Sequence, residues 1–171
     1  MTQPDNNMHT GVPRQARIQA EHPVLSITGL VDQLVELSPD DISQLPHIPF
    51  GQPLPTDDKC QVPTNRWSGV RIADVLNLAG LQADARFVLI SGGPFGTPLA
   101  LDRLDHVLLC DTLDDAPIDV EHGGPWRLVV GDQRFCASVK WVDSMLVTHD
   151  EPDNSGQRIV AARRRAAENR A

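Results

Sequence analysis

The chain has 171 residues and a formal net charge of -8, with 40% hydrophobic and 22% charged residues. This length predicts one domain with a substantial core. The chain's content of Leu, Val and Ile excludes a disordered chain. The acidity disfavours general nucleic-acid binding, which needs a basic face. The charge is uneven, because residues 1–150 carry -10 and residues 151–171 carry +2.

The sequence also favours one compartment. No stretch approaches the roughly 18–20 apolar residues of a membrane span, and residues 1–7 lack the basic and apolar regions of a secretory signal. The cysteines Cys60, Cys110 and Cys136 are an odd set without a CxxC pair, which fits a reducing environment. We therefore expect a cytoplasmic protein that binds no membrane and no nucleic acid.

The first half of the chain contains strong helix signals between strand-like segments. Residues 1–22 are predicted to form a polar N-terminal arm, and a strand is expected at 24–31. Ser38 and Pro39 predict the start of a short helix. Five prolines at 46–66 predict a long irregular loop. A second amphipathic helix is expected at 71–80, ending at Gly80.

The second half is rich in apolar segments of strand length. Strands are predicted at 87–91, 106–110, 126–131, 138–142 and 144–148. Many short strands with a few short helices indicate a single mixed α+β domain over residues 23–150. Residues 151–171 are predicted to form a basic, flexible tail, with a short helix as the alternative. Three tryptophans are expected in the core, and two cysteines are expected as small buried hydrophobes: Trp67, Trp126, Trp141, Cys110 and Cys136.

Three sequence elements follow one another at informative distances. They are Trp67-Ser-Gly-Val-Arg-Ile, then Glu121-His-Gly-Gly-Pro-Trp-Arg, then Ser138-Val-Lys-Trp-Val. In this order they resemble the molybdopterin-binding domain of the sulfite oxidase family, which includes sulfite oxidases, plant-type nitrate reductases and methionine-sulfoxide reductase catalytic subunits. The resemblance extends over residues 24–150. It implies the mixed α+β fold of that family and one pyranopterin molybdenum cofactor.

The resemblance also implies roles for individual residues. His122, Arg127 and Lys140 occupy the positions that contact the pterin and its phosphate, and Cys60 is the candidate molybdenum ligand. These residue types suit the task, because Arg offers a bidentate fork to phosphate and Lys a point charge. The alternatives are that His122 is a turn residue before Gly123-Gly124-Pro125, and that Arg127 and Lys140 face water on alternating strands. Cys60 could likewise be an ordinary loop cysteine beside a degenerate site.

The function implied is a small molybdopterin-dependent oxidoreductase that transfers an oxygen atom to or from a small oxyanion or sulfoxide. The sequence has no haem or flavin motif, so an external electron-transfer partner is expected. The tyrosine that lies near the metal in several family members has no counterpart, because the chain contains no tyrosine. The competing hypotheses are a cofactor-free relative that acts as a binding or interaction module, and a protein that carries or inserts the cofactor.

Overall fold

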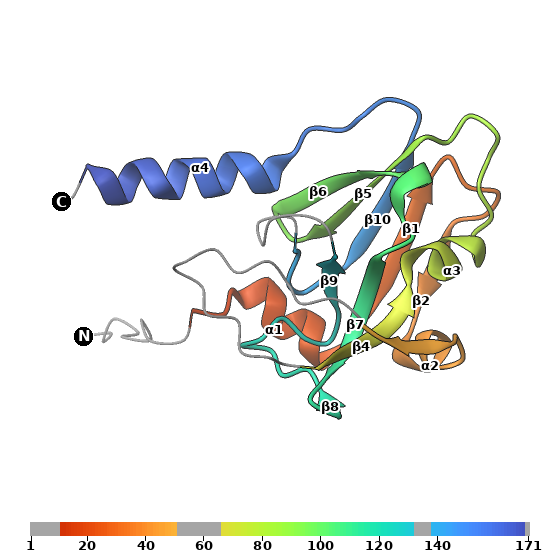
Figure 1. Ribbon diagram of the computed structural model, residues 1–171, viewed down its shortest axis with the longest axis horizontal. Coiled ribbons are helices and arrows are strands. Elements are labelled where there is room, and N and C mark those ends of the chain that lie inside the picture. Colours follow the sequence, from red (N-terminus) through yellow and green to blue (C-terminus); the bar gives the residue numbers. More distant parts are fainter. Residues whose placement is uncertain (1–10, 51–65, 132–137, 170–171) are drawn as a thin grey trace, which may run out of the picture.

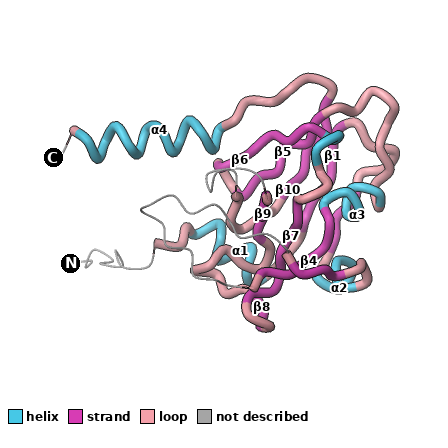
Figure 2. Tube along the Cα trace, viewed as in Figure 1, coloured by secondary structure: helices cyan, strands magenta, loops and turns pink. Residues whose placement is uncertain are grey.

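The computed structural model describes residues 11–50, 66–131 and 138–169 (Figure 1). In this part of the chain, ten strands form two sheets, with the helices beside them (Figure 2). One sheet is mixed and the other is antiparallel throughout. The α+β fold class predicted from the sequence is confirmed. Among the described helices, none is long and apolar enough to cross a membrane.

The first sheet has the strand order β2-β1-β10-β5-β6. Its central strand comes last in the sequence: β10 pairs in parallel with β1 and antiparallel with β5. The alternating burial of β1 and β10 follows from the period-two pattern of a sheet that covers a core. The bounds are β1 (Leu25–Gly29), β2 (Val35–Leu37), β5 (Phe87–Gly92), β6 (Phe95–Ala100) and β10 (Ser144–Thr148).

The second sheet has the order β3-β4-β7-β8, and β9 also pairs with β7. All four residues of β9 are buried, as expected for a strand covered on both faces. The register between β4 and β7 shifts between Ser68 and Gly69, where the backbones approach so closely that a side chain on Gly69 would meet the carbonyl of Leu109. The bounds are β3 (His47–Pro49), β4 (Trp67–Arg71), β7 (Val107–Leu113), β8 (Ala116–Pro117) and β9 (Arg127–Val130).

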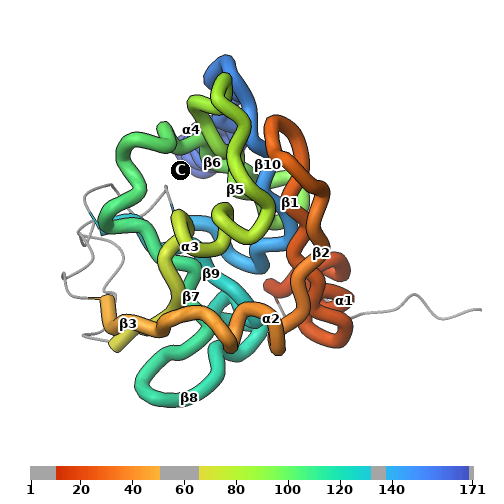
Figure 3. The backbone as a smooth tube through the Cα atoms, turned by 90° about the vertical axis from the view of Figure 1, so that its right-hand side faces the viewer, coloured from red at the N-terminus to blue at the C-terminus, as the bar shows by residue number. Residues whose placement is uncertain are grey.

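The main core contains buried residues of both sheets, and helix α3 (Ile72–Asn77) contributes Val75 and Leu76 to it. Figure 3 shows α3 beside β7. Trp126 is buried in this core and Trp67 in a smaller cluster beside it, both as predicted. Helix α2 (Pro39–Ser43) begins with the capping box that the sequence indicated, because Ser38 and Asp41 satisfy each other's backbone N–H groups.

One strand expected from the sequence is absent. Residues 138–142 form no strand, because Trp141 adopts a φ of 56° and interrupts the extended backbone. The strand expected at 87–91 is confirmed as β5, which forms a hairpin with β6. A short 3-10 turn (Leu101–Arg103) follows β6.

Both ends of the described chain are helical. Residues assigned to a polar arm form α1 (Arg14–Glu21), whose buried Gln19 side chain donates hydrogen bonds to the carbonyls of Val24 at 2.8 Å and Val142 at 3.0 Å. These two bonds fasten α1 to the domain. The basic tail contains α4 (Ser155–Glu168), capped by Asn154. Figure 1 shows α4 leaving the sheets with its C-terminal end away from the body.

Candidate functional site

The turn before β9 is built around two adjacent glycines. Gly123 has a φ of 104°, a conformation open to glycine, and Gly124 lies against the carbonyl of Ile118 with no room for a side chain. Asp119 holds the turn by accepting hydrogen bonds at 2.8 Å from the backbone N–H and the Nδ1 of His122. These bonds hold the pKa of the Asp119 carboxyl below its usual range.

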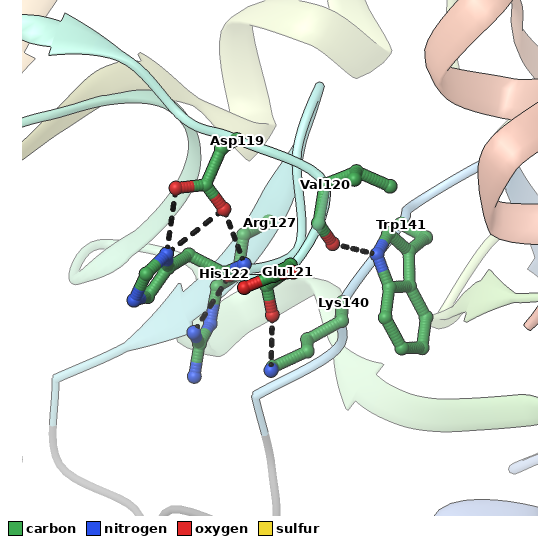
Figure 4. Close-up of polar contacts among 7 residues, drawn as sticks. All are labelled: Asp119, Val120, Glu121, His122, Arg127, Lys140 and Trp141. Carbon is green, nitrogen blue, oxygen red and sulfur yellow. Dashed lines mark hydrogen bonds and ion pairs between the residues drawn. The ribbon is translucent and has the colours of Figure 1, made fainter. Parts of the chain in front are cut away.

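The segment after residue 137 packs against this turn through three polar contacts. The backbone N–H of Trp141 donates to the carbonyl of Gly123 at 2.9 Å, and its Nε1 donates to the carbonyl of Val120 at 2.6 Å. The Nζ of Lys140 donates to the carbonyl of Glu121 at 2.9 Å (Figure 4). The turn therefore sets the position of the Lys140 side chain.

Arg127 is the first residue of β9, and only 5% of it is exposed. Its Nη1 donates to the carbonyl of His122 at 2.9 Å, and its Nε donates to the Oγ of Ser138 at 3.2 Å. The guanidinium carbon lies 4.9 Å from the ring centroid of Trp67. The guanidinium is thus held from three sides by groups of three different segments.

The structure brings Arg127 and Lys140 into one electrostatic environment. Burial lowers the pKa of both side chains, and the charge of Arg127 lowers the pKa of Lys140 further. Two like charges that lose part of their hydration are costly to keep together. An anion between them would offset this cost, so the pair favours a negatively charged ligand.

These two cations line a cavity of about 420 Å³. Its wall combines the segment at 138–143 with the β5–β6 hairpin, and with residues of α1 and α4. Asp143 lines it as well, with its Oδ2 accepting a hydrogen bond from the N–H of Gly93 at 3.0 Å. The volume falls within the range of about 300–1,000 Å³ usual for small-ligand sites.

The structure places the other predicted site residues differently. His122 is absent from the cavity lining: its ring pairs with Asp119, and its carbonyl accepts from Arg127. Cys60 and Cys136 lie outside the described residues. Cys110 is fully buried, as predicted for a small hydrophobe, and burial raises the pKa of its thiol. Among the described residues, no group of three or more His, Cys, Asp or Glu side chains could hold a metal ion.

The sequence interpretation missed several residues of this site. It assigned Trp141 to the core and gave no role to Ser138, although Trp141 and Ser138 both line the cavity. Ser138 also accepts a hydrogen bond from Arg127. It also gave no role to Ile159, Val160 and Arg163 of α4. Their spacing, three and four residues apart, is the helical periodicity that would have indicated a common face.

We expect Gly123→Ala to destabilise the fold by about 2 kcal/mol, because an L side chain is strained at positive φ. In addition, its methyl carbon would lie 2.7 Å from Cγ of Lys140. The loss should appear in urea unfolding. Gly11→Ala is the matched control, since, apart from its chain neighbours, no atom of the described residues lies within 4 Å of the added carbon. Equal stability of the two variants would contradict this account of the turn.

The two sheets and the paired cations define an α+β domain with a cavity lined by cationic side chains. A family model described as the oxidoreductase molybdopterin binding domain matches residues 9–155, and the chain belongs to this family. The match covers the described elements from α1 to β10 and includes Arg127 and Lys140.

Curated relatives agree with this assignment. The chain is 31% identical over 104 residues to mitochondrial sulfite oxidase of Drosophila melanogaster, covering 54% of this chain and 18% of that protein. It is 28% identical over 170 residues to the NADH nitrate reductase of Volvox carteri, covering 79% of this chain and 20% of that protein. It is also 28% identical to the uncharacterized oxidoreductase YuiH of Bacillus subtilis, covering 74% of this chain and 65% of that protein. The chain thus spans about a fifth of the first two relatives.

A solved structure shows the same fold. The sulfane dehydrogenase SoxCD from Paracoccus pantotrophus superposes with a TM-score of 0.65 at 20% sequence identity. The match covers 78% of this chain and 39% of that chain. Backbone architecture is therefore shared with a much longer protein.

Proposed function

We propose that this protein binds a pyranopterin molybdenum cofactor and catalyses oxygen-atom transfer to or from a small oxyanion or sulfoxide. The observation that carries the proposal is the pairing of a buried guanidinium, Arg127, with a half-buried ammonium, Lys140, at one cavity. Family membership supports the choice of cofactor. The sulfite oxidases and nitrate reductases among the relatives support a small oxyanion as substrate.

The donor set fits an anionic cofactor. An ammonium has three N–H donors, and among the described residues Lys140 uses one of them, on the carbonyl of Glu121. A phosphate would accept from the remaining donors, and Arg is the preferred partner for a bidentate phosphate contact. The cavity therefore combines charge, donors and volume suited to the pterin phosphate.

The chain's own part in the reaction is to bind and orient. Trp67, Ser138 and the carbonyl of His122 hold the Arg127 guanidinium, so less conformational freedom is lost when an anion binds. Lys140 adds the second positive charge from the segment at 138–143. Cys60 would supply the thiolate for the metal, and an external redox protein would exchange the electrons.

The cofactor, when bound, supplies oxygen-atom transfer coupled to two-electron redox change. The protein environment then decides which substrates reach it. Because Arg127 and Lys140 would contact the cofactor phosphate, their charges would be compensated there. Turnover measurements with oxyanions and sulfoxides therefore decide the substrate class.

The test is metal and pterin analysis of the full chain, purified from a host that makes the cofactor. We expect about one molybdenum per chain, and turnover of sulfite, nitrate or a sulfoxide with an artificial electron carrier. Protein without molybdenum or pterin would contradict the proposal and favour a cofactor-free binding module. Bound pterin without turnover of any of these compounds would favour cofactor carriage or insertion.

A further inference from the structure

Helix α4 presents one face to the cavity. Its residues Gly156, Ile159, Val160 and Arg163 are spaced three, four and seven positions apart, which places them on one side of a helix. Gly156 is buried, Ile159 and Val160 are half-buried, and Arg163 is exposed. The last three line the cavity, and exposure increases along this face from Gly156 to Arg163.

The first turn of α4 is fastened to the β5–β6 hairpin. The Oγ of Ser155 accepts a hydrogen bond from the N–H of Gly96 at 2.9 Å and donates one to the carbonyl of Pro94 at 3.0 Å. Gly156 packs against the ring of Phe95, where an added side-chain carbon would lie 2.7 Å from a ring atom. These contacts set the direction in which the helix leaves the body (Figure 1).

The attachment of α4 to the hairpin therefore places Arg163 at the cavity. Among the described residues, it is the third cationic side chain that lines the cavity, with Arg127 and Lys140. Arg165, two residues further along the same helix, has the same charge but is not part of the lining. The arginines of the tail are thus not equivalent, although the sequence shows them as one basic cluster.

We propose that Arg163 is a cofactor-binding residue, which closes the mouth of the cavity by contacting the phosphate held by Arg127 and Lys140. This inference rests on the proposed function. The phosphate would then contact the buried Arg127 on the interior side of the cavity and the exposed Arg163 on the solvent side. Because Arg163 is exposed, its contribution is screened by salt, whereas that of the buried Arg127 is screened much less.

The test compares retention of molybdopterin by the wild-type holoprotein, Arg163→Gln and Arg165→Gln. The pterin remaining after gel filtration is measured by its fluorescence at low and high ionic strength. We expect Arg163→Gln to weaken retention about fivefold at low ionic strength, the scale of one partly exposed charge-assisted contact, and less at high ionic strength. Arg165→Gln should behave as wild type, and Arg163→Lys should recover part of the loss.

Equal pterin retention by Arg163→Gln and Arg165→Gln at low ionic strength would overturn the role of Arg163 while leaving the proposed function intact. A wild-type protein without pterin would overturn both. Because Arg163 is exposed, its replacement should leave the helix and the fold unchanged, which circular dichroism of each variant checks.

Discussion

Replacing Arg127 with glutamine should lower the affinity for molybdopterin about a hundredfold, because a buried charge-assisted contact to phosphate contributes much more than an exposed one. Only 5% of Arg127 is exposed, so water cannot replace the lost guanidinium donors. Molybdenum and pterin should disappear from the purified protein together. Quantification of both in the same preparation measures the effect.

Two further variants separate binding from stability at this position. Arg127→Lys keeps the charge but loses the fork and the contacts to Ser138 and His122, so we expect an intermediate loss of pterin. Arg71→Gln removes an exposed arginine at the end of β4 and serves as the control. Normal pterin content in Arg127→Gln would contradict the assignment, provided that urea unfolding shows a folded protein.

Cys60→Ser should lower the catalytic activity by at least about a hundredfold, because losing a metal ligand costs at least as much activity as losing a residue that supports one. The pterin should remain, since Arg127, Lys140 and Arg163 still bind its phosphate. A hydroxyl is a poor substitute for a soft thiolate, so molybdenum should be lost or held in a changed environment. X-ray absorption at the molybdenum edge reports the loss of one sulfur ligand.

The matched control is Cys136→Ser, which removes a thiol from a residue expected to be a small buried hydrophobe. We expect molybdenum content and turnover close to wild type in this variant. Unchanged molybdenum and activity in Cys60→Ser would show that Cys60 is an ordinary loop cysteine. Together with the Arg127 variants, the experiment distinguishes the two halves of the site. Arg127→Gln should lose pterin and molybdenum together, whereas Cys60→Ser should keep the pterin and change only the molybdenum content or its coordination.

Local signals in the sequence predicted the elements whose causes are local. Ser38 and Asp41 specify the start of α2 through hydrogen bonds within three residues. The apolar spacing of Ile72, Val75 and Leu76 predicted α3, since these residues form one buried face. Residues 138–142 misled the same reasoning, because their apolar pattern suits a strand while Trp141 is held by a turn far away in the sequence.

The candidate site could be predicted only in part. Arg127 and Lys140 were identified by the resemblance, and the structure places both at one cavity. His122 was assigned to the pterin, whereas its ring pairs with Asp119 and its carbonyl orients Arg127. Ser138 and Trp141 were missed as lining residues, because side-chain placement depends on contacts between separate segments.

The sequence by itself determined the fold class, the starts of α2 and α3 and the family, since these depend on short-range patterns and on motifs in a fixed order. Only the tertiary structure decided which charges share a cavity. Lys140 lines the same cavity as Arg127 because the turn around Gly123 and Gly124 supports its side chain. Arg163 joins them because Ser155 fastens α4 to the β5–β6 hairpin. Such placements arise from hydrogen bonds across many residues of sequence, which no local pattern encodes.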